Sequence, residues 1–329
     1  NSGILLAGAA TLTVGHAGEG AAAINVGTAN DGGTLTTGSG LFKINKTGTV
    51  TIGNGANGGT LEVLGNITVD GGVLQEMSDM SSFAWATGKT LTIQNGGRVH
   101  FASSYTTAAN SVHALSGANS TFDIVGAINI RNTAQVNVSS GASLAAGQII
   151  VGAGGASGTL SVDGAGSAVT ALSDASLWGS GGVANVALSN QATATLGGSL
   201  HLADSAATLV NVLSGADLTV GDLSMAAIGG TAAATLNILG VGATVTLSPS
   251  SDLVVGHATS GTATINLLDG GALTVGTGGT TNVLGTGTIY LDAGTADLRA
   301  LSVVGGAINV NGGKLSFTTL SVSGGAINF

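Results

Sequence analysis

The sequence predicts an all-β fold, in which residues 1–329 form one right-handed parallel β-helix (a β-solenoid). Three observations predict it: short runs of alternating aliphatic and polar residues, Gly-rich breaks between the runs, and a repeat of roughly 19–26 residues. Repeats of this length are typical of solenoids, because one coil cannot bury its apolar face alone and successive coils must stack.

Short β-branched runs supply the expected strands. Examples are Thr49–Ile52, Leu273–Val275 and Ile308–Val310. They are too short for helices, and their period of two places successive side chains on opposite faces of a strand. We therefore expect aliphatic side chains to fill a narrow interior, while Thr, Asn and Ser face outward.

Pairs of glycines mark the expected corners between strands, because Gly adopts positive φ at little cost. The motif Gly-Gly-x-aliphatic occurs at Gly32–Leu35, Gly58–Leu61, Gly71–Leu74, Gly96–Val99, Gly197–Leu200, Gly270–Leu273, Gly305–Ile308, Gly312–Leu315 and Gly324–Ile327.

A longer match links two distant parts of the chain. The segments 14–25 and 255–266 share eight identical residues in a window of twelve, including His16 and His257 at the same offset. We expect both segments to adopt the same local structure. The two histidines are 241 residues apart, which is roughly 50 Å on a solenoid, so they cannot share a metal ion.

An aliphatic-Asn-aliphatic triplet recurs, and its Asn should face outward if the aliphatic residues face inward. Stacked outward Asn can form amide ladders; the alternatives are a solvated polar face or a face that binds glycans or a partner. The triplet occurs at Ile24–Val26, Ile128–Ile130, Val136–Val138, Val210–Val212, Leu236–Ile238, Ile265–Leu267, Ile308–Val310 and Ile327–Phe329.

The repeats lapse in residues 75–122, where bulky side chains gather. This stretch is interpreted as an irregular, aromatic-containing insertion or as coils that carry loops, a place where solenoids often carry function. One hypothesis is a patch that binds a partner, and the other is a local apolar plug that covers a widened coil. The candidate patch residues are Phe83, Trp85, Arg98, His100, Phe101 and Tyr105.

Composition excludes several classes of protein. Only 7% of the residues are charged, and the net charge of −9 argues against a nucleic-acid partner. The hydrophobic fraction of 43% argues against disorder. No apolar run reaches the ~18 residues of a membrane span, and the absence of Cys excludes a disulfide framework.

The sequence predicts no catalytic residue, no metal site and no cofactor. His201 with Asp204 is the nearest approach to a ligand pair, and the Gly-Gly-x-Gly-x-Asp calcium repeat is absent. Carboxyl pairs of the kind that glycosidases use are interpreted here as solvated side chains, since the 7 basic residues are scattered. These pairs are Asp217 with Asp222, Asp292 with Asp297, and Asp163 with Asp174.

The repeats resemble those of a known family. The segment 151–167, the segment 58–63 and the Leu-Thr-Val-Gly units at Leu218–Gly221 and Leu273–Gly276 resemble the degenerate repeats of bacterial autotransporter passenger domains and related large surface adhesins. That resemblance implies export through the outer membrane, a right-handed β-helix, and roles in adhesion, aggregation or biofilm. It implies no catalytic residues. Because the chain starts without Met, we expect a mature or excised segment.

We therefore expect an extracellular, cell-surface, non-enzymatic protein that acts in adhesion, self-association or the biofilm matrix. Its expected partners are copies of itself, lateral or end-to-end, and host or surface glycans. The first alternative is a subunit of a filament built by head-to-tail stacking of solenoids. The second is a polysaccharide-degrading enzyme. Thr-x-Thr pairs would suit an ice-binding face, but their spacing is irregular.

Overall fold

The computed structural model describes residues 3–5, 8–16, 18, 20–27, 32–53, 58–78, 81–172, 176–203, 205–226 and 232–329, with side chains from residue 8 onward. Every regular element in this part of the chain is a β-strand. No helix that could cross a membrane occurs among these residues. The chain divides into two compact units: unit 1 comprises Asn1–Ile128 and Asn132–Gly147, and unit 2 comprises Asn129–Arg131 and Gln148–Phe329.

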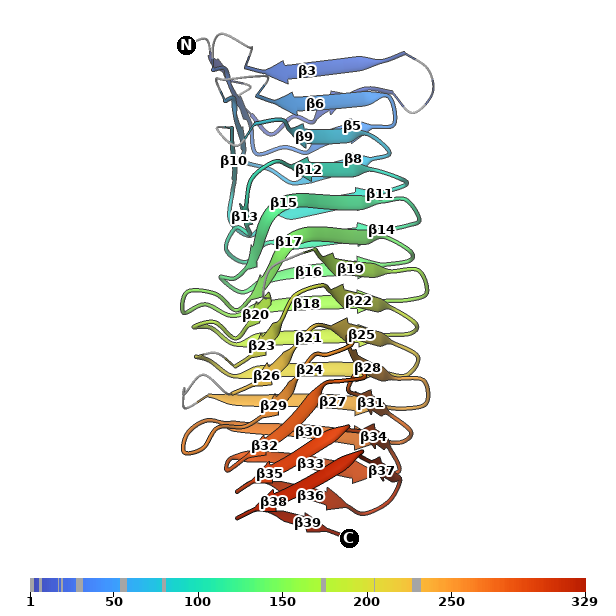
Figure 1. Ribbon diagram of the computed structural model, residues 1–329. Helices are drawn as coiled ribbons and strands as arrows, with labels where there is room; N and C mark the ends of the chain where they lie inside the picture. The colour runs from blue at the N-terminus through green and yellow to red at the C-terminus, as the bar shows by residue number, and fades with distance from the viewer. Residues whose placement is uncertain are drawn as a thin grey trace. The chain divides into compact units, whose positions relative to one another are not determined.

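In unit 1, parallel strands stack in three ladders, and β6, β9 and β12 can be followed side by side in Figure 1. The short sheet consists of β1 (Gly3–Leu5), β4 (Thr34–Thr37), β7 (Thr60–Val63) and β10 (Ser82–Trp85). The second ladder consists of β2 (Leu12–Val14), β5 (Phe42–Asn45), β8 (Ile67–Asp70), β11 (Thr90–Gln94), β14 (Val112–Ser116) and β16 (Ala134–Ser139). The third consists of β3 (Ala22–Val26), β6 (Gly48–Ile52), β9 (Val73–Glu76), β12 (Arg98–Phe101) and β15 (Thr121–Ile130), with β13 (Tyr105–Thr106) beside it.

Unit 2 repeats this architecture in three ladders of parallel strands. The first consists of β18 (Gly158–Asp163), β21 (Ala184–Ser189), β24 (Thr208–Leu213), β27 (Ala233–Leu239), β30 (Thr262–Leu268), β33 (Gly287–Asp292), β36 (Ala307–Val310) and β39 (Ala326–Asn328). The second consists of β19 (Ala168–Ala171), β22 (Thr193–Leu196), β25 (Asp217–Val220), β28 (Thr244–Leu247), β31 (Ala272–Thr274), β34 (Thr295–Asp297) and β37 (Lys314–Ser316). The third begins with the part of β17 (Ser143–Val151) from Gln148 onward. It continues with β20 (Ser176–Trp178), β23 (Leu200–Leu202), β26 (Leu223–Met225), β29 (Leu253–Val255), β32 (Thr280–Leu284), β35 (Ala300–Val304) and β38 (Thr319–Ser323).

The predicted fold class is confirmed in both units, each of which is a parallel β-solenoid. The length of a coil varies more widely than the repeats indicated. Side chains that hydrogen-bond between neighbouring coils are 19 residues apart at Asn309 and Asn328 but 29 residues apart at Asn237 and Asn266. The corners absorb this variation, since the strands themselves pair in register.

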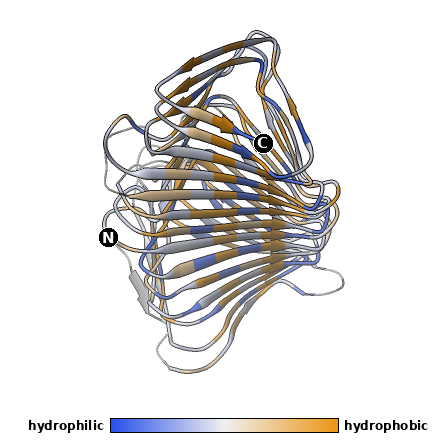
Figure 2. Cartoon of the chain, turned by 90° about the horizontal axis from the view of Figure 1, so that it is seen from below, coloured by the Kyte–Doolittle hydropathy of each residue, from blue (hydrophilic) through white to orange (hydrophobic). Residues whose placement is uncertain are grey.

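The predicted alternation is also confirmed, and it builds the core. Aligned bands of high and low hydropathy cross neighbouring strands in Figure 2. In β25, β28 and β31 the inward residues Leu218, Val245 and Leu273 pair with one another and are almost fully buried. Such ladders of like residues bury each coil against the next, which contributes about 25 cal/mol per Å² of apolar surface removed from water.

Residues 75–122 lie in unit 1 and form strands that belong to its ladders. β11 pairs with β8 and β14, while β12 pairs with β9 and β15. The short sheet behaves differently, because its order ends at β10. The short sheet therefore stops at β10, next to most of the bulky side chains.

Candidate functional site

The six residues of the predicted patch belong to two separate groups, because β12 alternates between the two faces of its sheet. Val99 and Phe101 point inward and are 0% and 1% exposed, whereas Arg98 is exposed and His100 is half-buried. Phe83, Trp85 and Tyr105 contribute to the inward group. The binding function assigned to these residues stays a prediction, and the structure divides it between an outer and an inner pocket.

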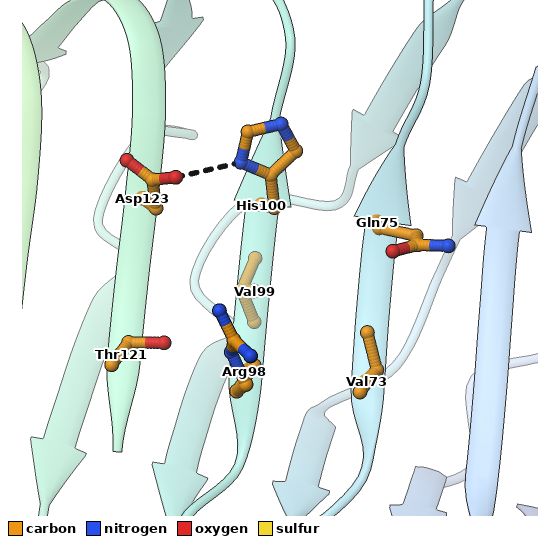
Figure 3. A pocket seen from close by; sticks show the side chains of 7 residues that line it. All are labelled: Val73, Gln75, Arg98, Val99, His100, Thr121 and Asp123. Carbon is orange, nitrogen blue, oxygen red and sulfur yellow. Dashed lines mark hydrogen bonds and ion pairs between the residues drawn. The ribbon is translucent and has the colours of Figure 1, made fainter. Parts of the chain in front are cut away.

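The outer pocket lies on the outward face of β9, β12 and β15, as Figure 3 shows. Its volume is about 230 Å³. The Nδ1 atom of His100 and the Oδ2 atom of Asp123 are 2.8 Å apart. The lining residues are Val73, Gln75, Arg98, Val99, His100, Thr121 and Asp123.

This lining combines a guanidinium, an imidazole next to a carboxylate, and an amide. Gln75 donates a hydrogen bond of 3.1 Å to the hydroxyl of Thr51 on the next strand, which fixes the amide. The side chains of His100 and Asp123 are 36% and 50% exposed, so water screens their interaction. Such a set can hydrogen-bond a polar ligand on an open surface.

The inward group forms an aromatic cluster with His113. The ring centroids of Phe101 and Tyr105 are 4.9 Å apart, and those of Phe83 and Phe101 are 5.2 Å apart. The ring of Trp85 meets His113 edge-on at 5.1 Å. Contacts of this geometry stabilise an aromatic cluster beyond the area that they bury.

His113 is fully buried within this cluster and shares a hydrogen bond with a phenol. Its Nε2 atom and the Oη atom of Tyr105 are 2.8 Å apart. Burial lowers the pKa of His113 to about 3, against a smaller opposing contribution from the Gln135 backbone. Burial also raises the pKa of Tyr105 above its usual value. Both side chains are therefore neutral near pH 7.

The inner pocket lies next to this cluster and is the more polar of the two pockets. It has a volume of about 280 Å³ and contains Glu76, whose side chain is only 2% exposed. One oxygen of Glu76 accepts hydrogen bonds from the hydroxyl of Ser103 at 2.8 Å and from its backbone N–H at 3.3 Å. The lining residues are Glu76, Ser81, Ser82, Phe83, Phe101, Ser103, Ser104, Tyr105 and Thr106.

In the carboxyl pair of Asp217 and Asp222, both side chains accept hydrogen bonds from neighbouring coils. The backbone N–H of Asp252 donates to Asp222 at 2.8 Å, and the hydroxyl of Thr244 donates to Asp217. Asp297 lies 3.4 Å from the guanidinium of Arg299. The contacts of Asp217 and Asp222 therefore connect neighbouring coils, whereas that of Asp297 is local.

The remaining carboxyl pair can be described only at Asp163. Hydrogen bonds from Ser189, at 2.6 Å, and Asn190, at 2.7 Å, lower the pKa of Asp163. Its predicted partner Asp174 lies outside the described residues, as does Asp204, the predicted neighbour of His201.

His16 and His257 make the same hydrogen bonds, each in its own turn. The backbone N–H of His16 donates to the Thr47 hydroxyl at 2.8 Å, and that of His257 donates to the Thr286 hydroxyl at 2.9 Å. Each Thr hydroxyl then donates to the carbonyl of the same histidine, at 3.1 and 3.0 Å. The same pair of hydrogen bonds therefore occurs at both histidines, and in each case it connects neighbouring coils. Within the described residues, no group of three or more His, Asp or Glu side chains could hold a metal ion.

Sequence reasoning missed Asp123 and did not assign Glu76 or His113 to a site. The available signal was the coil length, since Asp123 follows His100 by 23 residues and Ser103 follows Glu76 by 27 residues. The partner of such a side chain is therefore expected about one coil further along the chain. The exact offset differs from coil to coil, so the signal identifies a neighbourhood rather than a residue.

Comparisons with known proteins leave the family open. No family model matches the chain, and no curated protein matches it. A solved structure of the TibC-catalyzed hyper-glycosylated TibA55-350 fragment is 16% identical to this chain, and the match covers 98% of this chain and 100% of that one with a TM-score of 0.26.

Proposed function

We propose that this chain is a non-enzymatic, extracellular β-helical surface protein that acts by lateral self-association and adhesion. The face formed by the outward side chains of β24, β27 and β30 in unit 2, hereafter the Asn-Leu face, carries this proposal. Copies of the chain would meet through it side by side.

The Asn-Leu face includes two parallel rows that carry the proposal. The amide of Asn237 donates to Asn211, and the amide of Asn266 donates to Asn237, both at 2.8 Å. This is the amide ladder that the Asn triplets predicted. Next to it, the outward side chains of Leu213, Leu239 and Leu268 pair in register and are half-exposed, and they form a second, apolar row.

The chemistry of this face favours contact with another uncharged surface. None of the outward side chains on these three strands is ionisable, although the chain carries a net charge of −9. Like-charge repulsion is therefore small where two such faces approach. Covering the leucine row would remove apolar surface from water, and the hydrogen bonds of the neighbouring amide row hold the three strands' Asn side chains in place.

A charge placed in the leucine row tests self-association. We expect Leu239→Asp to weaken the association constant, measured by sedimentation over a range of concentrations, by at least about tenfold, because an unpaired carboxylate would be desolvated in the contact. Leu172→Asp is the matched control, since Leu172 is 65% exposed in unit 2 but lies after β19, away from the face. Equal association of the two variants would exclude the Asn-Leu face.

The non-enzymatic part of the proposal is supported by the Asp side chains that sequence analysis paired. Asp217 and Asp222 are occupied by hydrogen bonds from the next coil. We expect no release of reducing ends from a panel of acidic and neutral polysaccharides. Activity that Asp217→Asn or Asp222→Asn abolishes, with the fold retained by circular dichroism, would instead establish a polysaccharide-degrading enzyme.

A further inference from the structure

The inner pocket arises because the short sheet ends at β10. Among the described residues, β10 pairs with β7 along one edge and with no strand along the other. Its inward side chains Phe83 and Trp85 are therefore only half-buried, whereas Phe101 and Tyr105 beside them are 1% and 6% exposed. The pocket is lined from both β10 and β13, which lie near one another in Figure 1.

Glu76 places a carboxylate inside this pocket. The side chain ends an inward-facing row of β9 and is 2% exposed. Both groups of Ser103 that contact it are hydrogen-bond donors, and both donate to the same carboxyl oxygen. No ion pair is recorded for Glu76 in the described part of the chain. A buried charge is costly unless an opposite charge compensates it.

The rest of the lining suits a positively charged ligand. Hydroxyl oxygens accept hydrogen bonds from a cation, and the faces of aromatic rings attract a cation that lies within ~6 Å. The three rings at the pocket have centroids between 4.9 and 6.2 Å apart. The lining residues that carry aliphatic hydroxyl groups are Ser81, Ser82, Ser103, Ser104 and Thr106.

We propose that the inner pocket binds a primary ammonium group, carried by a small amine or by a lysine side chain. An ammonium group has three N–H donors, which match one carboxylate and neighbouring hydroxyl oxygens. The volume of about 280 Å³ admits this group with a short alkyl chain. The net charge of −9 raises the local concentration of cations. The site lies in unit 1 and so goes beyond the self-association proposed for unit 2.

Isothermal titration calorimetry on the full chain tests this assignment with four probes. n-Butylammonium chloride and Nα-acetyl-lysine N-methylamide carry the ammonium group, 1-butanol is the neutral analogue, and glucose is the polyol. We expect both ammonium probes to bind, with 1-butanol and glucose at least about tenfold weaker. Binding of n-butylammonium alone would identify a free amine as the source of the group, and binding of both would admit a lysine side chain.

Two variants assign the binding to Glu76. Glu76→Gln keeps the shape and removes the charge, and should weaken n-butylammonium binding at least about tenfold. Asp123→Asn, in the outer pocket of the same unit, should leave the affinity unchanged. If Glu76→Gln does not fold, Thr106→Lys provides the test, because Thr106 is exposed at the rim and a tethered ammonium there should abolish binding. Unchanged affinity in either folded variant, or equal binding of 1-butanol, would overturn the proposal.

Discussion

Replacing Gly256 with Ala should lower the free energy of unfolding of unit 2 by more than ~4 kcal/mol. Single substitutions seldom cause a loss of this size. Gly256 has a φ of +86°, a conformation that costs other residues ~1–2 kcal/mol. An added Cβ would also lie 2.3 Å from the backbone nitrogen of Gly287 and 2.6 Å from its Cα. That backbone belongs to β33 and is held in its ladder, so it cannot move away cheaply.

A second glycine separates the two contributions. Gly155 lies in the same unit with a φ of +83°, but a Cβ added there would meet nothing within 4 Å. We expect Gly155→Ala to cost only the ~1–2 kcal/mol of the backbone conformation. Urea unfolding followed by circular dichroism would measure both variants. Similar losses at the two positions would show that the close approach of neighbouring coils at Gly256 contributes little.

The turns at His16 and His257 show what could and could not be predicted from the sequence. The segments 14–25 and 255–266 share eight residues, and the same hydrogen bond from a histidine N–H to a threonine hydroxyl occurs in both. The role of the turn could not be predicted, because it depends on a threonine one coil away. That threonine is 31 residues from His16 but 29 residues from His257, so no fixed offset leads to it.

The fold class was predictable for a different reason. Alternation with period two and glycines at corners are features of a few consecutive residues, so each short run by itself indicates a strand. Contacts between coils depend on the summed length of three strands and three corners. This is why the amide ladder of Asn211 and Asn237 was foreseen, since the same triplet recurs, whereas the pairing of His100 with Asp123 was not.

The alternation along strand β12 was visible in the sequence, but the hypothesis of a single binding patch did not take it into account. Within Arg98–Phe101, polar and apolar residues alternate, which places Arg98 and His100 on the face opposite Phe101. A single surface containing all three was therefore incompatible with a strand. The end of the short sheet at β10, by contrast, is a tertiary feature and has no local signal.

Acid should destabilise unit 1 through His113. His113 occupies an inward position between Leu91 and Val136 in paired strands, where a charge cannot be solvated. Its pKa is about 3 in the fold, compared with 6.5 for an ordinary histidine. Because the folded pKa is lowered, the unfolded chain binds the extra proton first as pH falls. The contribution is complete above the unfolded pKa and is lost progressively as pH decreases toward the folded pKa.

The expected size follows from this difference in pKa. Each pH unit below 6.5 costs up to ~1.4 kcal/mol, so the free energy of unfolding should fall by about 2 kcal/mol by pH ~5. Hydrogen bonds from Asn95 and from Ser189 lower the pKa of Asp70 and Asp163. These carboxylates stay ionised in that window. A loss of stability between pH ~6.5 and ~5 therefore does not come from these two side chains.

Paired substitutions isolate His113 from its partner. His113→Leu alone leaves the buried Tyr105 hydroxyl without its partner and should cost ~1–3 kcal/mol near neutral pH, whereas the double variant with Tyr105→Phe removes both polar groups and should recover most of that loss. The double variant should also lose the dependence on pH, while His100→Asn, a change at a half-buried histidine on the outer face, should retain it. Urea unfolding at several pH values would measure all four chains. A double variant with the same pH dependence as the parent chain would show that the proton is taken up elsewhere.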